Sequence, residues 1–483
     1  MFSFFRRDTK KDAAIFDKII NNPKFQIDEI LFVVGRALST APPSSWKRIN
    51  KILENIINYN EEELKQECYN GLPELPSLRA LVWKINFHYF PKDIHKWNSI
   101  LRLKRDEYTE TKNALLLRQK AEMQIFEDLE KQKKESEEKK QNSDENNNNP
   151  NENTENTNSN ENSDNNNNIN INSLSSIAEN TDRSLLETID KDVNRTHNDL
   201  PFFNKFVNEQ VTISDEEIKK MIEHKRNCTY QDYKVVYTKG RNDNNIFNNE
   251  THSDVIARIL YVYSKLNKDV GYVQGMNEIL AVIYYCYCVD SHLDIETIEA
   301  DTYWSFSTLM GDIRTIFSQE NDNQKDGIVE KISILDTIVS TLQKDIYSIM
   351  LKNHINICHF AFTWINLFFC QHFSIEDTMK LWDVVFSEND RYYFVYFFSM
   401  AILQYKKKRI EKEEFCVIVN ELQHLKIPNI DEVIKIAVNL KKKYDKKVKD
   451  ILAKFEDTSE EGNIDIDHVF HKNSIYYKKK DSK

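Results

Sequence analysis

The spacing of apolar residues predicts helices along most of the chain. In six segments apolar side chains recur every three or four positions, which places them on one face of an α-helix. These segments are 45–58, 94–118, 252–266, 328–351, 355–369 and 431–455. Two longer apolar runs, 279–289 and 392–403, fall short of the roughly 20 residues that a membrane span needs. Both runs therefore predict buried helices.

Alternation of apolar and polar residues, which is typical of a half-buried strand, is rare. The short stretch 235–237, Val-Val-Tyr, is the one candidate. No internal repeat with a period of about 20 to 50 residues is visible, so the pattern does not predict a solenoid. The expected fold class is all-α, with helices packed ridge into groove.

The composition changes sharply between residues 131 and 180. A run of mixed charge, 131–140, leads into a tract rich in Asn, Glu and Ser, and few of these side chains could be buried. Because burial could not offset the entropy of ordering this tract, we expect a disordered Asn-rich insertion. Periodic apolar segments flank it, so it should interrupt one domain. The predicted organisation is an N-terminal extension over 1–44, a helical domain over 45–455 interrupted by 131–180, and a polar C-terminal tail over 456–483.

Composition and charge exclude several classes of function. The chain has 8 glycines and neither a G-x-x-x-x-G-K-[ST] nor a G-x-G-x-x-G motif, so we expect no nucleotide site of its own. A net charge of −11 argues against nucleic-acid binding, which depends on clustered Lys and Arg. The 7 scattered cysteines favour reduced cytosolic thiols over disulfides or a zinc site. The stretch 1–7 places its charges after a very short apolar run and is not a signal peptide.

Three short motifs occur in order along the chain. The first is an R-x-x-x-W formed by Arg79 and Trp83, which are four residues apart and therefore share a helix face. The second is an I-x-x-D-x-x-R over Ile189–Arg195. The third is a Y-x-Q-G over Tyr272–Gly275, preceded by Gly271. Each motif alone is weak evidence of a resemblance, whereas the three motifs in this order are specific evidence.

Together these motifs resemble the TBC domain, the helical domain of Rab GTPase-activating proteins. Three later blocks are similar to the same domain and follow in the same order, over 304–317, 360–364 and 380–386. The resemblance extends from about residue 45 to residue 455, without the insertion. It implies an all-α, two-lobed, V-shaped domain that holds a GTPase in its groove.

The resemblance also implies how the protein would act on a GTPase. Hydrolysis in small GTPases is limited by charge that builds up on the phosphate oxygens and by poor positioning of the attacking water. The resemblance assigns Arg195 as an arginine finger that neutralises this charge, and Gln274 as a glutamine finger that orients the water. Arginine fingers accelerate hydrolysis by about 10³- to 10⁵-fold.

Other residues of the motifs are expected to support the site. The expected supporting residues are Arg79, Trp83, Ile189, Asp192, Tyr272 and Gly275. Asp192 lies three residues before Arg195, a spacing that would place its carboxylate beside the guanidinium. Tyr272 would position Gln274. Of the first motif's two residues, Arg79 should be the more exposed. Because glycine is so scarce, Gly271 and Gly275 predict a tight turn or a close backbone approach.

The partner follows from the same resemblance. It would be a Rab-family GTPase in its GTP-bound state, and it would carry the GTP and Mg²⁺. The protein would be a GTPase activator without an active site, cofactor or metal of its own. It would regulate vesicle trafficking from the cytoplasm or as a peripheral protein on endomembranes, without a transmembrane segment. Two alternatives remain: a catalytically silent Rab-binding scaffold or effector, and an all-α scaffold without a GTPase partner.

The sequence departs from the family pattern at several positions. Thr363 stands where the family usually has arginine, and Gln371-His372 stand where an Arg-Glu pair is common. In the family pattern these positions look like ion pairs of the scaffold. We therefore expect their replacement to affect the stability of the fold rather than the chemistry. In the loop after the second motif, 196–198 contain no proline, and the first one is Pro201. The polar stretch 239–250 lengthens the link to the third motif and should be a surface loop.

Overall fold

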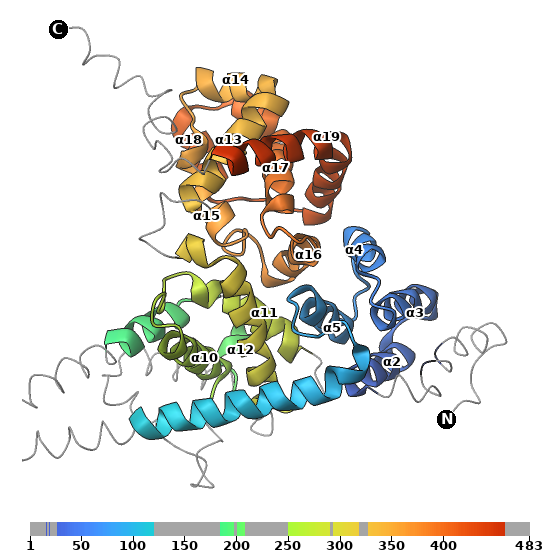
Figure 1. Ribbon diagram of the computed structural model, residues 1–483. Helices are drawn as coiled ribbons and strands as arrows, with labels where there is room; N and C mark the ends of the chain where they lie inside the picture. The colour runs from blue at the N-terminus through green and yellow to red at the C-terminus, as the bar shows by residue number, and fades with distance from the viewer. Residues whose placement is uncertain are drawn as a thin grey trace, which may run out of the picture. The chain divides into compact units, whose positions relative to one another are not determined.

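The computed structural model describes Phe16, Ile19 and residues 27–119, 184–197, 200–207, 250–289, 293–317 and 327–458. These residues are almost entirely helical and contain no β-strand, although one antiparallel bridge joins Phe206 to Thr251. The all-α class expected from the periodicity is confirmed for the described part of the chain (Figure 1). The strand candidate at 235–237 and the Asn-rich insertion at 131–180 lie outside the described residues.

The described residues form α-helices and a few short 3₁₀ turns. Their bounds are α2 (Asp28–Thr40), α3 (Pro43–Ile57), α4 (Glu61–Tyr69), α5 (Pro76–Asn86), α10 (His252–Leu266), α11 (Met276–Cys288), α12 (Ile295–Asp312), α13 (Ile328–Leu342), α14 (Lys344–Lys352), α15 (Ala361–Asn366), α16 (Ile375–Val385), α17 (Tyr393–Lys412), α18 (Phe415–Gln423) and α19 (Ile430–Thr458). The 3₁₀ turns are η2 (Ile94–Lys96), η4 (Pro201–Asn204), η6 (Arg314–Phe317) and η8 (Ile357–His359). Two further helices cover residues 97–119 and 184–193.

The chain forms two compact units. One comprises residues 1–108 and 263–483, and the other comprises residues 109–262. In the first unit α2 packs on α3 and α5, although α2 lies in the segment expected to precede the helical domain. The domain boundary expected at residue 45 stays a prediction.

Several predicted helices are present with nearly the predicted bounds. The segments 45–58, 252–266 and 431–455 correspond to α3, α10 and α19. The apolar runs 279–289 and 392–403 correspond to the buried helices α11 and α17, and α17 lies beside α19 (Figure 1). Among the described residues, no helix combines the length and the apolar character needed to cross a bilayer.

Two predicted segments are less regular than the periodicity suggests. The segment 328–351 is divided between α13 and α14 at Gln343, whose ψ is 51° and whose side-chain amide donates to the carbonyl of Met400 at 3.0 Å. The segment 355–369 contains only η8 and the six-residue α15, and it ends with Phe368 and Phe369 in the left-handed region. Periodicity reports which side chains are buried, but it does not show where the backbone leaves the helix.

Buried tryptophans connect the helices of the first unit. Their rings supply apolar area, and each indole N–H donates to an acceptor on a separate segment. The backbone contacts are Trp46 to Ala37 at 2.9 Å, Trp97 to Pro91 at 2.8 Å, Trp364 to Leu422 at 3.0 Å and Trp382 to Phe368 at 2.9 Å. All four rings are at most 1% exposed.

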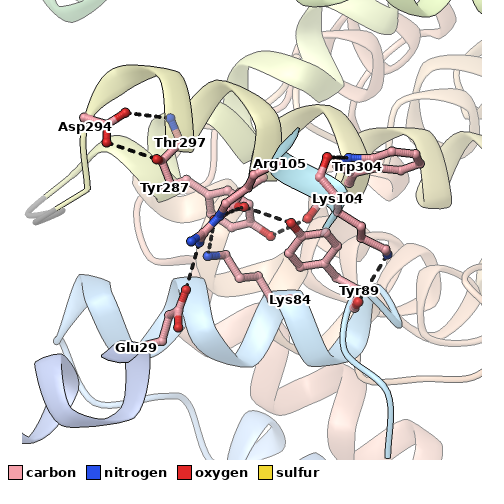
Figure 2. Close-up of polar contacts among 11 residues, drawn as sticks. Glu29, Lys84, Tyr89, Lys104, Arg105, Tyr287, Asp294, Thr297 and Trp304 are labelled. Atoms are coloured by element: carbon pink, nitrogen blue, oxygen red, sulfur yellow. Dashed lines mark hydrogen bonds and ion pairs between the residues drawn. The ribbon is translucent and has the colours of Figure 1, made fainter. Parts of the chain in front are cut away.

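A buried ion network joins the N-terminal helices to α12 within the first unit. Asp301 is fully buried and accepts from Lys84 Nζ at 2.6 Å and from Arg105 Nη2 at 2.7 Å. The hydroxyl of Tyr89 donates to the same carboxylate at 2.8 Å, and Arg105 also bonds Glu29 at 2.8 Å (Figure 2). Burial opposes ionisation, but the two cations outweigh it and lower the pKa of Asp301. The network therefore holds α2, α5, the 97–119 helix and α12 in one arrangement.

Candidate functional site

Arg195 lies in a turn directly after the 184–193 helix, in the second unit. Its backbone N–H donates to the carbonyl of Asp192 at 3.2 Å, and its side chain is 55% exposed. The guanidinium forms an ion pair with the carboxylate of Asp192, which is only 7% exposed. The pairing expected from the three-residue spacing is therefore present.

Buried residues fix the turn that carries Arg195. Ile189 is fully buried and anchors the 184–193 helix, which directly precedes the turn. The hydroxyl of Thr196 donates to the carbonyl of Asp192 at 2.8 Å. His197 adopts a left-handed φ of 43°, and its ring stacks on Phe203 with centroids 5.9 Å apart. The chain therefore turns at His197 without a proline at residue 196 or 197.

Gln274 lies in a tight loop immediately before α11, in the first unit. Gly271 and Gly275 on either side have φ values of 66° and 104°, as expected from their glycine identity. A Cβ atom on Gly275 would lie 2.8 Å from Leu367 Cδ2, which is too close for real atoms. Gly275 is buried, whereas the side chain of Gln274 is exposed.

The side chain of Asn277 joins the two sides of this loop. Its Oδ1 atom accepts from the Tyr272 hydroxyl at 3.1 Å and from the Gly275 N–H at 3.0 Å. Tyr272 was expected to position Gln274, and its hydroxyl bonds the side chain of Asn277 at the start of α11. The motif analysis missed Asn277. A usable signal was its place at the start of a helix, where a short polar side chain can accept a backbone N–H.

The two residues of the first motif share a buried acceptor. Arg79 Nε donates to the carboxylate of Asp383 on α16 at 3.0 and 3.1 Å, and Trp83 Nε1 donates to it at 2.8 Å. Arg79 is 8% exposed and Trp83 is fully buried, so the expected order of exposure holds but both residues are interior. Burial raises the pKa of Asp383, and its two donors counteract this shift. This buried cluster ties α5 to α16.

The departures at Thr363 and His372 compensate one another. The Thr363 hydroxyl and His372 Nε2 form a hydrogen bond of 2.9 Å. Burial, assisted by the nearby His424, lowers the pKa of His372 to about 4, so the ring is neutral at pH 7. A neutral hydrogen bond therefore stands where the family pattern suggested an ion pair.

No group of three or more His, Cys, Asp or Glu side chains in the described part of the chain could hold a metal ion. A cavity of about 40 Å³ lies beside Glu29, Lys84 and Asp301. This volume accommodates water but not a nucleotide.

Comparisons with known proteins agree with the fold and the family resemblance. The family model of the Rab-GTPase-TBC domain matches residues 208–411. This range contains the Tyr272–Gly275 motif and the later blocks, whereas Arg79, Trp83 and the Ile189–Arg195 motif precede it.

Similar proteins extend the comparison over more of the chain. TBC1 domain family member 13 of Homo sapiens is 26% identical over 406 residues, which cover 78% of this chain and 93% of that protein. TBC1 domain family member 22A of Homo sapiens is 24% identical over 198 residues, which cover 37% of each chain. The crystal structure of the Ypt/Rab-GAP domain of Gyp1p has the same fold, with a TM-score of 0.52, 16% identity and coverage of 89% of this chain and 96% of that one.

Proposed function

Since the chain belongs to the TBC-domain family of Rab GTPase-activating proteins, we propose that it stimulates GTP hydrolysis by a Rab-type GTPase through Arg195 and Gln274. One observation carries the assignment of these two residues. Each is exposed, while the residue that follows it and another polar residue near it are buried: Thr196 and Asp192 beside Arg195, and Gly275 and Asn277 beside Gln274. Such an arrangement holds one side chain toward solvent from a fixed backbone.

The proposed role of Arg195 is to neutralise charge on the partner's phosphate. A guanidinium has five N–H donors in a rigid plane, and the bond to Asp192 involves Nη2. Donors on the other nitrogens remain available for phosphate oxygens. The carboxylate limits the rotation of a long and flexible side chain, so less entropy is lost when the phosphate is bound.

The proposed role of Gln274 is to orient the attacking water. A side-chain amide both donates and accepts hydrogen bonds, so it can bind the water and a phosphate oxygen together. The left-handed backbone at Gly275 fixes where the preceding side chain begins. The partner, in its GTP-bound state, carries GTP and Mg²⁺ and resides at endomembranes, where the protein would act to regulate vesicle traffic.

Single-turnover hydrolysis tests this proposal. Purified Rab GTPases loaded with GTP are mixed with the unaltered protein, and phosphate release is followed for each. We expect at least one to be accelerated, and Arg195→Ala, Arg195→Lys and Gln274→Ala to lose most of the acceleration, about 10³-fold for the arginine. Arg102→Ala is the control, since Arg102 is 86% exposed and lies outside the motifs.

Two results would contradict the proposal in different ways. Acceleration that survives in both Arg195→Ala and Gln274→Ala would exclude these residues as the fingers. GTP-dependent binding without acceleration by the unaltered protein would indicate the silent scaffold or effector instead.

A further inference from the structure

We propose that Asn277 is a positioning residue that holds the Gln274 loop in the geometry needed for hydrolysis. This inference rests on the proposed function of Gln274. In this inference, the buried side chain of Asn277 holds the backbone on both sides of Gln274. The exposed side chain of Gln274 is thereby positioned.

Asn277 accepts hydrogen bonds from residues on both sides of Gln274. Tyr272 lies two residues before Gln274, and its hydroxyl donates to Asn277 Oδ1 at 3.1 Å. Gly275 directly follows Gln274, and its N–H donates to the same oxygen at 3.0 Å. A backbone N–H can only donate, so the oxygen of the amide must face the loop. One acceptor therefore fixes the chain before and after Gln274.

Asn277 itself is held rigidly. It is the second residue of α11 and is only 2% exposed. Just before it, the N–H of Met276 donates to the carbonyl of Val273 at 3.1 Å, and the N–H of Glu278 donates to the carbonyl of Gly275 at 3.1 Å. The start of the helix and the loop thus form one hydrogen-bonded unit, to which the Asn277 side chain adds the two bonds that flank Gln274.

Removing the acceptor should loosen the loop without removing Gln274. Asn277→Leu retains a similar volume but leaves the Tyr272 hydroxyl and the Gly275 N–H without this oxygen. A catalytic group misplaced by about 1 Å can cost about 100-fold in rate. Asn277→Asp retains an oxygen at the same position, so it should retain most of the positioning effect.

The test uses the chain of 483 residues and one Rab GTPase. This GTPase is chosen from a purified panel preloaded with GTP, as the one that the unaltered protein stimulates most. Single-turnover rates are measured against activator concentration for Asn277→Leu, Asn277→Asp and Tyr272→Phe. We expect Asn277→Leu to lower the saturating rate by about 10- to 100-fold, with the half-saturating concentration within about 2-fold. Asn277→Asp should recover most of the rate, and Tyr272→Phe should show a smaller loss.

A double-mutant cycle separates positioning from general destabilisation. In a Gln274→Ala background, Asn277→Leu should cause no further loss, because its effect acts through Gln274. Asn50→Leu is the matched control, since Asn50 is a buried asparagine on α3 that bonds Glu54 and does not touch the loop. It should leave the saturating rate unchanged.

Three outcomes would overturn the inference. An unchanged rate for Asn277→Leu, or a full further loss in the Gln274→Ala background, would show that Asn277 does not act through Gln274. Failure of the unaltered protein to stimulate any GTPase would overturn the proposed function and this inference with it. If Asn277→Leu does not fold, Tyr272→Phe carries the same cycle, because it removes only one hydroxyl group.

Discussion

Leu367 occupies the space that a side chain at Gly275 would need. A Cβ atom on Gly275 would lie 2.8 Å from Leu367 Cδ2, and the backbone there has a φ of 104°. Leu367 directly follows α15, and Gly275 directly precedes α11. The segment after α15 therefore constrains the loop that carries Gln274, although the two are far apart in sequence.

Gly275→Ala should impair both stability and rate. The left-handed backbone strains any residue with a Cβ atom, which costs about 1–3 kcal/mol, and the close contact requires the Leu367 side chain or the loop to shift. Urea unfolding should show the loss of stability, and single-turnover hydrolysis should show a reduced saturating rate. Adding Leu367→Ala should relieve the contact but not the strained φ. If the Gly275→Ala protein matches the unaltered one in both measurements, the constraint is not real.

Gly35→Ala is the control for the preceding substitution. Gly35 lies within α2, has an ordinary helical backbone, and has no atom within 4 Å of a built Cβ. Alanine is favoured over glycine inside a helix by about 0.5–1 kcal/mol, so this variant should be slightly more stable. Its rate should be unchanged.

Asp192→Asn should reduce the rate without a large effect on stability. The substitution removes the charge that holds the guanidinium of Arg195 but retains the shape of the side chain. Because the arginine is more than half exposed, the pair should contribute less than about 1 kcal/mol to folding. We expect the saturating rate to fall about 10-fold. This loss of rate should disappear in an Arg195→Ala background. The control is Asp106→Asn, which alters the exposed pair with Arg102 and should leave both the rate and the stability unchanged.

Arg79→Met should destabilise the fold rather than alter the chemistry. It leaves the buried carboxylate of Asp383 with Trp83 but without its cation, and removal of one partner of a buried pair costs about 3–5 kcal/mol. Chemical denaturation should show this loss, whereas Arg102→Met at an exposed position should stay within about 0.5 kcal/mol. A reduced saturating rate in fully folded Arg79→Met would instead place Arg79 in the site.

The free energy of unfolding should fall as the pH falls from 6.5 to 4. The pKa of His372 is lowered to about 4, so in this window the unfolded chain binds a proton that the folded chain does not. The pKa of His252 is also lowered to about 4, mainly by burial, and acts in the same direction. His372→Gln keeps a neutral group beside Thr363 and should flatten part of this dependence. Denaturation at pH 7 and pH 5 measures it, and an identical slope in the variant would refute the assignment.

Local sequence was enough to predict the fold class and the motif positions. The all-α class follows from the spacing of apolar residues, because an amphipathic helix needs only a local repeat. The left-handed turns at Gly271 and Gly275 were predictable for the same reason, since only glycine adopts that backbone at little cost. The pairing of Asp192 with Arg195 required no more than helical spacing.

Contacts between distant segments could be found only in the folded chain. Arg79 and Asp383 are 304 residues apart, and no local pattern links a buried cation to its acceptor on another helix. The closeness of Leu367 to Gly275 and the bond between Thr363 and His372 likewise depend on how elements pack. Periodicity specifies which face of a helix is apolar, whereas packing decides which residues that face meets. The motifs that contain Arg195 and Gln274 were therefore local information, whereas the scaffold that holds them depends on tertiary contacts.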